Sequence, residues 1–301
     1  MKSLSFLFLV FVLCYLLILP SAFASTKPDG TITVLPSIIR LDLSQDLPQA
    51  NLTYTNNTAQ VVELNFSASD FTQLEDSYKL SFLEGKNAKN YQYALSSWID
   101  FDKKSISLQP GEQGTVTVLV NKEQLTPGGH YGTILASVDS KDTDQSVQIH
   151  SILSSLIFVR TATGKETDAG KIETFAPERE WFGFPNTFLV GFNNTGDTDL
   201  SPHGLIQLFD PFGKEVTRAV VNEDSLVTLP ESIRRYDVSL EKQNSFLFPG
   251  VYKATIYLHF GKKDTQIQTQ TRFFSLGSIP LLFLILLLPT LGFVGWKRYR
   301  R

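Results

Sequence analysis

Cysteine is almost absent from this chain of 301 residues. The only one, Cys14, lies in an apolar stretch close to the N-terminus, so the rest of the chain has neither disulfides nor thiolate chemistry. Extracellular domains of this size in animals are usually held together by disulfides, and their absence here favours a bacterial source.

The residue patterns of catalytic sites are also missing. The chain has no nucleophile elbow, no P-loop and no dinucleotide-binding glycine motif. Asp139, Asp142 and Asp144 form an acidic loop, but the glycine and the final glutamate of a calcium-binding loop are absent, which favours a solvated hairpin tip. We therefore expect no enzyme and no cofactor. Metal binding is not expected either, because the histidines are not spaced as ligands: His130, His150, His203 and His259.

An excess of positive charge is lacking too. The chain has 27 basic and 30 acidic residues, and five of the basic ones lie at its two ends, which leaves 22 basic residues and a net charge of −8 between them. Because binding to nucleic acid depends on clustered lysine and arginine, this acidic balance argues against nucleic acid as a partner.

An apolar stretch opens the chain. Lys2 is followed by the apolar core Leu4–Leu19 and then by Ala22 and Ala24, small residues at the −3 and −1 positions of a cleavage site. This layout predicts a secretory signal peptide over residues 1–24. An uncleaved membrane anchor is the alternative, although the stretch is shorter than the ~20 residues of a typical span.

A second apolar stretch lies near the C-terminus. No charged residue occurs from Phe273 to Trp296, which predicts a membrane-spanning helix at residues 275–296 with Trp296 at the membrane interface. By the positive-inside rule the tail at 297–301 is cytoplasmic, so we expect a single-pass protein of the cell membrane with its folded part outside. Four cations make up most of that tail: Lys297, Arg298, Arg300 and Arg301.

Between the two ends the pattern is that of strands. Segments such as 39–43 and 253–258 alternate apolar and polar residues, which is typical of strands with one face in a core. Turn residues separate them, and no segment has helical periodicity with caps. The sequence predicts an all-β fold of two sandwich domains, at 31–160 and 171–274, with a polar linker at 161–170.

The two predicted domains repeat the same series of motifs. An Asn-Asn-Thr turn occurs at 56–58 and at 193–195, and the segments 110–112 and 230–232 each precede a strand. A Pro-Gly turn followed by a tyrosine at a strand start also occurs twice, as in the tyrosine corner of immunoglobulin-like folds. Its two copies are Pro127, Gly128 and Tyr131 in the first domain, and Pro249, Gly250 and Tyr252 in the second.

Two aromatic groups are candidates for a partner-binding patch. They are Trp98 with Phe101, and Trp181 with Phe182 and Phe184. Aromatic residues dominate sandwich cores, so packing inside or between the domains is the other interpretation. Exposure of the side chains decides between a packed core and a surface that binds a partner.

The run from Ser97 to Glu112 and the Pro-Gly-Gly-His-Tyr-Gly run at 127–132 resemble the N-terminal domain of the WxL-interacting proteins of Gram-positive bacteria, and more loosely the PapD-like immunoglobulin fold. That family has a signal peptide, two such domains, a membrane helix and a short basic tail. The resemblance implies a non-enzymatic scaffold that binds peptidoglycan through the first domain and a surface protein through the second.

The sequence thus favours a membrane-anchored surface scaffold that engages wall material, another surface protein or both. A chaperone-like assembly factor that uses an edge strand is an alternative, motivated by the PapD-like pattern. A hydrolase of wall polymer is a further one, and it would need a cleft with two facing carboxylates about 5–9 Å apart.

Overall fold

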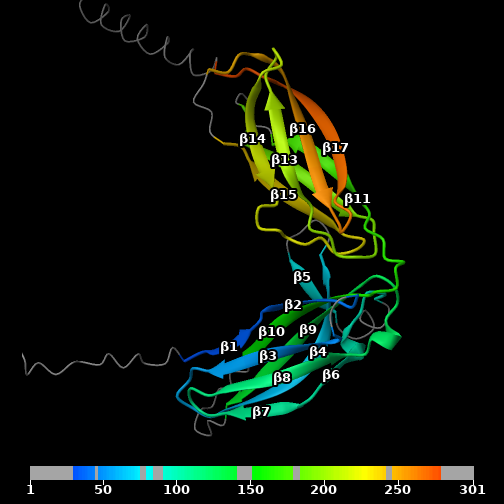
Figure 1. Ribbon diagram of the computed structural model, residues 1–301. Helices are drawn as coiled ribbons and strands as arrows, with labels where there is room; N and C mark the ends of the chain where they lie inside the picture. Colours follow the sequence, from blue (N-terminus) through cyan, green and yellow to red (C-terminus); the bar gives the residue numbers. More distant parts are fainter. Residues whose placement is uncertain are drawn as a thin grey trace, which may run out of the picture.

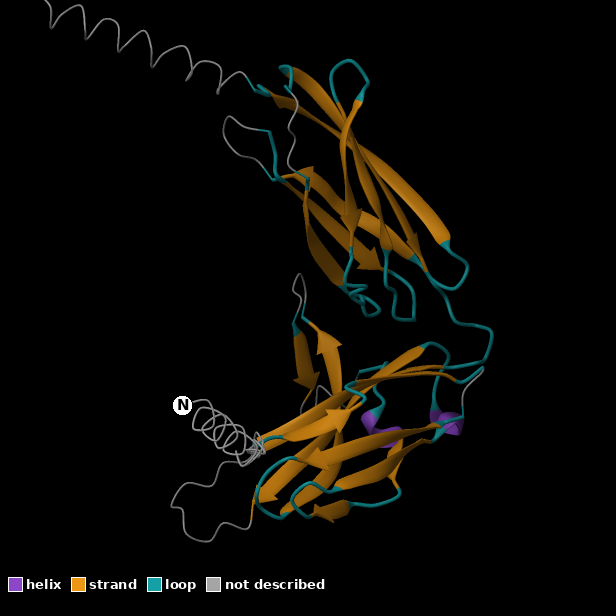
Figure 2. Ribbon diagram, turned by 60° about the vertical axis from the view of Figure 1, so that its left-hand side comes forward, coloured by secondary structure: helices purple, strands orange, loops and turns teal. Residues whose placement is uncertain are grey.

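The computed structural model describes residues 30–44, 47–74, 79–83, 91–140, 151–178, 184–241 and 246–278. In these ranges the regular structure is strand, apart from two single turns of 3-10 helix, η1 (Ser96–Trp98) and η2 (Lys122–Gln124). The prediction of an all-β fold is therefore confirmed. Figure 2 shows the strands arranged in two bodies that meet at an angle.

The first body is a sandwich of two sheets (Figure 1). One sheet has the order β1 (Ile32–Leu35), β3 (Gln49–Asn56), β8 (Gln113–Val120) and β6 (Ile99–Phe101). The other has the order β2 (Ile38–Asp42), β10 (Ser151–Arg160), β9 (Gly129–Ser140), β4 (Val62–Gln73) and β5 (Leu80–Leu83), with β7 (Ser105–Leu108) also paired to β4. Alternate residues of both sheets point inward and form one core, because the strands have a side-chain period of two.

The chain changes sheets between β1 and β2. β1 lies antiparallel to β3 in one sheet, and β2 lies parallel to β10 in the other. Pro36 and Ser37 make the crossing, where the Ser155 hydroxyl donates to the Pro36 carbonyl at 3.0 Å and the Leu156 amide donates to the Ser37 carbonyl at 2.9 Å. As a consequence β2 accompanies only the second half of β10.

The second body is a smaller sandwich. One sheet has the order β11 (Gly170–Pro177), β12 (Thr187–Asn194) and β15 (Ile233–Ser239). The other has the order β14 (Glu215–Val221), β13 (His203–Phe209), β16 (Gly250–Phe260) and β17 (Thr265–Ser275). Large aromatic residues fill its core, among them Phe188, Phe192 and Tyr252, each of which is fully buried.

A buried asparagine holds the same turn in each sandwich. The Asn56 amide donates to the carbonyls of Gln60 and Leu108 at 2.8 and 3.0 Å, while its carbonyl accepts from the Thr58 amide at 2.9 Å. Asn194 repeats this arrangement with other partners. The repeated sequence motif is therefore a repeated structure, shifted by one residue, because Asn56 opens its Asn-Asn pair whereas Asn194 closes its own.

Replacement of Asn194 by alanine is expected to destabilise the second sandwich. Its amide donates to the carbonyls of Thr198 and Thr228 at 2.7 and 2.9 Å, and both carbonyls would lose a buried partner. We expect a loss of about 2–4 kcal/mol in the free energy of unfolding, measured by urea denaturation. Asn193→Ala is the matched control and should cost less than about 0.5 kcal/mol. Equal losses in the two variants would show that the turn does not depend on Asn194.

The two sandwiches are joined by an aromatic cluster. Leu229 of the second sandwich, which is 1 % exposed, packs among Phe71, Tyr93, Tyr131 and Phe158 of the first. Because Phe71, Tyr131 and Phe158 project from the outer face of the β2–β10–β9–β4 sheet, this face looks toward the second sandwich. The molecule is therefore bent, with a concave side lined by that sheet (Figure 1).

Polar contacts supplement the cluster. The Gln73 side chain donates to the Ile233 carbonyl at 3.2 Å and accepts from the Leu229 amide at 3.3 Å. The segment that we expected to be a linker, residues 161–170, connects β10 to β11 and bonds to both sandwiches: the Thr161 hydroxyl donates to the Gly128 carbonyl, and the Thr167 amide donates to the Asp197 carboxylate. The proposed domain boundaries remain predictions.

Several sequence predictions concern residues that lie outside the described ranges. They are the signal peptide at 1–24 with Ala22 and Ala24, residues 279–296 of the predicted membrane helix, and the tail at 297–301. The predicted start of that helix at 275 is wrong, because Ser275 is the last residue of β17 and Ser278 is hydrogen-bonded to Leu247 of the second sandwich. Within the described ranges, no helix has the length and apolar character needed to cross a membrane.

Candidate partner-binding site

The first half of β10 has only one neighbouring strand. β9 pairs with all of β10, from Ser151 to Arg160, whereas β2 pairs with it only from Leu156 onward. In the described part of the chain, no strand pairs with Ser151–Ser155 on the side away from β9. This segment is an open sheet edge, and such edges are templates for the addition of another strand.

The direction of the backbone groups at this edge follows from the crossing. The Leu156 amide points away from β9, because it donates to Ser37. Successive residues in a strand alternate, so the amides of Ile152 and Ser154 point the same way as that of Leu156. An added strand would therefore find donors and acceptors at Ile152 and Ser154, while Leu153 and Ser155 are bonded to β9.

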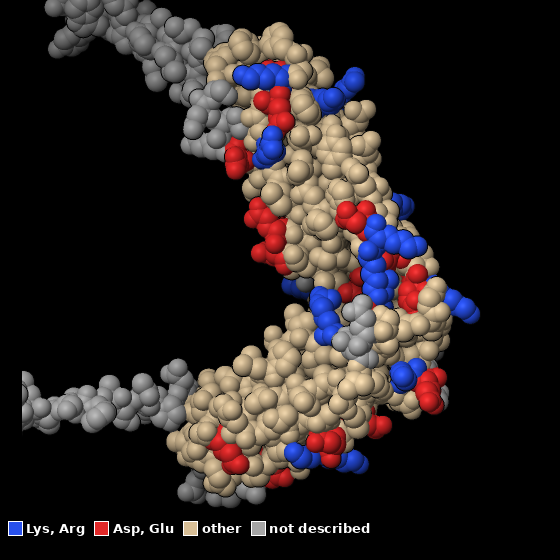
Figure 3. All heavy atoms as spheres, viewed as in Figure 1, with Lys and Arg blue, Asp and Glu red and all other residues tan. Residues whose placement is uncertain are grey.

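The outer sheet face beside this edge carries no charged residue in three successive sets of cross-strand neighbours. Register places Ile152 with Ser137 and Asn65, Ser154 with Leu135 and Ser67, and Leu156 with Ile38, Thr133 and Ser69. Ile152 and Ile38 are 62 % and 48 % exposed. Figure 3 shows the concave side of the first sandwich as largely free of lysine, arginine, aspartate and glutamate. The face therefore suits an uncharged, partly apolar ligand surface.

Charged residues gather instead where the two sandwiches meet. The Arg40 guanidinium lies over the Phe158 ring, 4.6 Å from its centroid, and donates to Asp199 of the second sandwich at 2.9 Å. Arg160 pairs with Asp168 at 2.8 Å, and a cavity of about 340 Å³ lies beside these groups. Each arginine is engaged by a carboxylate, and the pair of Arg40 with Asp199 joins the two sandwiches.

The carboxylates at the bend have shifted pKa values. Burial raises the pKa of Asp199, and this effect outweighs the opposing influence of Arg40. Burial also acts to raise the pKa of Asp42, but hydrogen bonds from Lys262 and Ser44 prevail and lower it to about 2. Asp168 behaves like Asp42, since bonds from Thr198, Lys262 and Arg160 outweigh its burial and lower its pKa.

Acidification is therefore expected to weaken the bend. The Asp42 pKa is lower in the folded state than its ordinary value of 3.8, so its contribution is present above that pH and is lost as the pH falls through about 2. Asp199 has the opposite sign, because protonation relieves the burial of its charge. We predict that the melting temperature of Asp42→Asn falls less than that of the wild type when the pH is lowered from 4 to 2. Asp100→Asn, at an exposed position, is the control and should follow the wild type; an identical decline in all three proteins would contradict this assignment.

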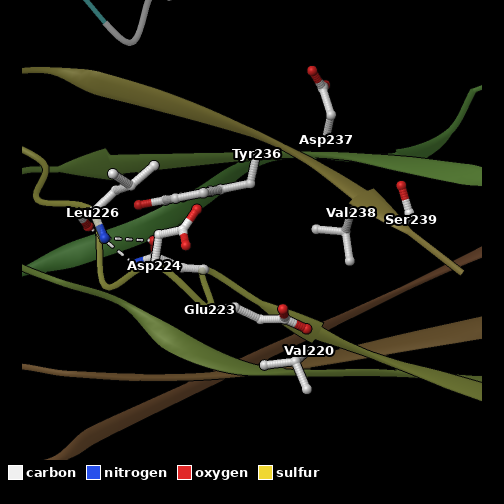
Figure 4. Close-up of a pocket in the computed structure, with 9 residues that line it drawn as sticks. Val220, Glu223, Asp224, Leu226, Tyr236, Asp237, Val238 and Ser239 are labelled. Atoms are coloured by element: carbon white, nitrogen blue, oxygen red, sulfur yellow. Dashed lines mark hydrogen bonds between the residues drawn. The ribbon is translucent and has the colours of Figure 1, made fainter. Parts of the chain in front are cut away.

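A groove opens along one side of the second sandwich. It lies between the edge strands β14 and β15, each of which has one neighbour in the described part of the chain. The groove has a volume of about 330 Å³, with Val220, Leu226, Tyr236 and Val238 among its lining residues. Figure 4 shows Glu223 and Asp224 along one wall and the Asp237 carboxylate directed away from them. Two facing carboxylates, as a hydrolase of wall polymer needs, are not formed by these three residues.

The predicted aromatic patch stays a prediction, because only three of its five members lie in the described ranges. Phe101 is half-buried and packs on the first core with its ring 6.1 Å from that of Phe66. Phe184 is half-buried and meets the rings of Tyr252 and Phe273 in the second sandwich. Trp98 is half-buried on η1. The other two members of the predicted patch, Trp181 and Phe182, lie outside the described residues.

The two predicted tyrosine corners differ. The Tyr252 hydroxyl donates to the Phe248 carbonyl at 2.6 Å, four residues upstream, which is the bond of a tyrosine corner. Tyr131 is fully buried in the cluster between the sandwiches, and its hydroxyl has no hydrogen-bond partner by distance and angle within the described residues. Its ring serves the contact with Leu229, which explains why it departs from the corner geometry.

The turn residues of the two motifs are placed as follows. Pro127 is exposed, and Gly128 is buried with its amide donating to the Thr161 hydroxyl at 2.8 Å. Pro249 directly precedes β16, which begins at Gly250, and Gly250 has a φ of 151°.

Two of the three aspartates of the predicted acidic loop, Asp142 and Asp144, lie outside the described residues. Among the described residues, no group of three or more side chains could hold a metal ion.

No protein-family model and no curated protein sequence matches this chain. Similar solved structures include fimbrial chaperones. A chain from a chaperone and tip-adhesin complex of CFA/I fimbriae biogenesis aligns with 8 % identity and a TM-score of 0.45, covering 82 % of this chain and 99 % of its own. The class 5 fimbriae chaperone CfaA has 8 % identity and a TM-score of 0.45, with coverage of 81 % and 99 %.

The E. coli chaperone DraB aligns with 14 % identity and a TM-score of 0.40, covering 81 % of this chain and 98 % of its own. None of these three alignments reaches a TM-score of 0.5, so they do not assign a function to this chain. The open edge of β10 was not among the predicted site residues. The sequence of 151–160 indicates a strand but does not reveal how far its neighbour extends.

Proposed function

We propose that this chain is a protein-binding, chaperone-like module that takes an extended segment of a partner protein onto the free edge of β10. The observation that carries the proposal is the half-paired strand, because no strand of the described chain pairs with the outward backbone groups of Ile152 and Ser154. The uncharged outer face beside them supplies contact for alternate side chains of the added strand. Strand addition of this kind takes its affinity from main-chain hydrogen bonds and its specificity from such side-chain contacts.

We also propose where the module acts. The apolar stretch at 1–24 exports the chain, and the segment at 275–296 then holds it in the cell membrane as a single-pass protein with both sandwiches outside. Its partner is accordingly another exported or surface protein. A tethered module would hold a partner at the membrane rather than carry it through the periplasm or the wall.

Site-specific photo-crosslinking tests the proposed site. The full chain is made in its native cells with p-benzoylphenylalanine at position 152, and the product of irradiation is analysed by mass spectrometry. We expect a crosslink to an extended segment of one exported protein. The control position is Leu119, which is 40 % exposed on the outer face of the other sheet. Equal yields from the two positions, or no product from position 152, would contradict the proposal.

A second candidate function is the surface scaffold that the WxL-interacting resemblance implies, and the groove between β14 and β15 favours it. Two free strand edges flank a lining there that mixes acidic, polar and apolar side chains, and Glu223, Asp224 and Asp237 have no ion-pair partner within the described residues. This groove suits a surface-protein segment with basic residues. Binding of peptidoglycan by the first sandwich stays a prediction, which sedimentation of the full chain with purified peptidoglycan tests.

A further inference from the structure

Exposed phenylalanines gather at the end of the second sandwich that is remote from the first. Phe212 in the turn between β13 and β14 is 76 % exposed, and Phe246 and Phe248 before β16 are 49 % and 50 % exposed. The Phe212 and Phe248 rings meet edge to face at 5.5 Å, and those of Phe246 and Phe248 at 5.1 Å. We call these three residues the aromatic tip.

Other apolar side chains extend the aromatic tip along the neighbouring strands. Val251 is the second residue of β16 and lies directly opposite Phe274, near the end of β17, and the two are 54 % and 67 % exposed. Single exposed apolar residues are common on soluble proteins, but a contiguous group of large ones marks a surface that contacts a partner or a lipid.

The described chain leaves the second sandwich at the aromatic tip. The Ser278 amide donates to the Leu247 carbonyl at 2.8 Å, and the Leu247 amide donates to the Ser278 hydroxyl at 3.0 Å. Leu247 stands between Phe246 and Phe248 in the sequence, so the exit point is fixed beside their rings. From residue 279 the sequence continues with eighteen uncharged residues that end at Trp296.

Basic residues accompany the apolar group. Lys214 follows Phe212 in the same turn and is exposed, and Lys253 lies opposite Arg272 on the same strand pair as Val251 and Phe274. Figure 3 shows positive side chains around this end of the second sandwich. Exposed apolar rings with cations beside them are the chemistry of a surface that rests on anionic lipid headgroups.

We propose that the aromatic tip is a membrane-contact surface, which inserts Phe212, Phe246 and Phe248 into the outer headgroup region of the bilayer that the chain enters. This inference rests on the proposed membrane segment at 275–296. Because Ser278 is still hydrogen-bonded to Leu247 and the uncharged run begins at the next residue, the second sandwich stands directly on the lipid. The concave side and the free edge of β10 are thereby held at a set height and orientation above the membrane.

Depth-dependent quenching in vesicles tests the contact. The full chain, with Cys14→Ser, is reconstituted into vesicles of equimolar phosphatidylethanolamine and phosphatidylglycerol that contain a lipid with a nitroxide high in its acyl chain. A small environment-sensitive fluorophore is attached to Phe212→Cys or, as the control, to Ser107→Cys at an exposed site of the first sandwich. We expect quenching about threefold stronger or more at position 212, because only that position reaches the interface.

A double variant shows whether the rings are responsible. Phe246→Ser with Phe248→Ser is expected to reduce quenching at position 212, while the circular dichroism spectrum and co-flotation with vesicles stay unchanged, since both rings are about half exposed. Co-flotation with equal quenching at positions 212 and 107 would overturn the membrane-contact surface alone. Failure of the wild type to co-float would overturn the membrane segment, and the proposed contact with it.

Discussion

Ser154→Pro is expected to abolish partner binding while the fold is kept. The Ser154 amide points to the free edge of β10, so proline removes a donor that the added strand needs and breaks no bond to β9. We expect the photo-crosslink from position 152 to fall at least about tenfold, because every main-chain bond beyond the proline is put out of reach. The melting temperature should shift by no more than about 2–4 °C.

Two neighbouring substitutions serve as controls for this result. Ser154→Ala keeps the amide and loses only the hydroxyl, so the crosslink should stay at the wild-type yield. Ser155→Pro removes an amide that faces β9 and should cost about 3 kcal/mol in the free energy of unfolding. A loss of that size would confirm the direction of the backbone groups. Wild-type crosslinking by Ser154→Pro would show that the partner does not add to this edge.

Leu229→Ala is expected to loosen the bend between the two sandwiches. Leu229 is 1 % exposed and fills a space among Phe71, Tyr93, Tyr131 and Phe158, so its truncation leaves a cavity that rigid aromatic rings fill poorly. Truncation of a buried leucine costs about 2–5 kcal/mol, and here the loss falls on the contact between the sandwiches. Spin labels at Ser107→Cys and Gln270→Cys, in the Cys14→Ser chain, should report a broader distance distribution by double electron–electron resonance.

The matched control is Leu47→Ala. Leu47 is 70 % exposed, so its truncation removes little packing and should leave the distance distribution unchanged. A broad distribution in the wild type itself would show that the bend is mobile without any change to the cluster. An unchanged distribution in Leu229→Ala would assign the angle to the ion pairs of Arg40 and Arg160 instead.

The sequence predicted the all-β class because strand periodicity is local. The repeats at 56–58 and 193–195 also carried structural meaning, since a turn that needs a buried asparagine leaves a trace at that position. Register was harder to predict: the Asn-Asn-Thr motifs align by letters, whereas the structure aligns Asn56 with Asn194. A single-residue shift of this kind depends on contacts with distant carbonyls, such as those of Leu108 and Thr228.

The role of the predicted site residues stays a prediction, although the structure shows positions for several of them that the sequence does not reveal. Aromatic residues draw attention in a sequence, but Phe101 and Phe184 pack on the two cores. The two Pro-Gly motifs with their tyrosines look alike in the sequence. However, Tyr131 packs against Leu229 of the second sandwich, while the Tyr252 hydroxyl donates to the Phe248 carbonyl as in a tyrosine corner. The free edge of β10 depends on where the chain crosses between sheets at Pro36 and Ser37, more than a hundred residues away in the sequence. No local pattern contains that information.

Hydrogen exchange at single residues of β10 tests strand addition most directly. The probe is a synthetic peptide of the partner segment identified by the crosslink from position 152, added to the full chain and followed by nuclear magnetic resonance or by fragmentation mass spectrometry. Strand addition predicts slower exchange of the Ile152 and Ser154 amides, with no change at Leu153 and Ser155, which are already bonded to β9. Unchanged exchange at Ile152 and Ser154 in the saturated complex would contradict the proposed mode of binding.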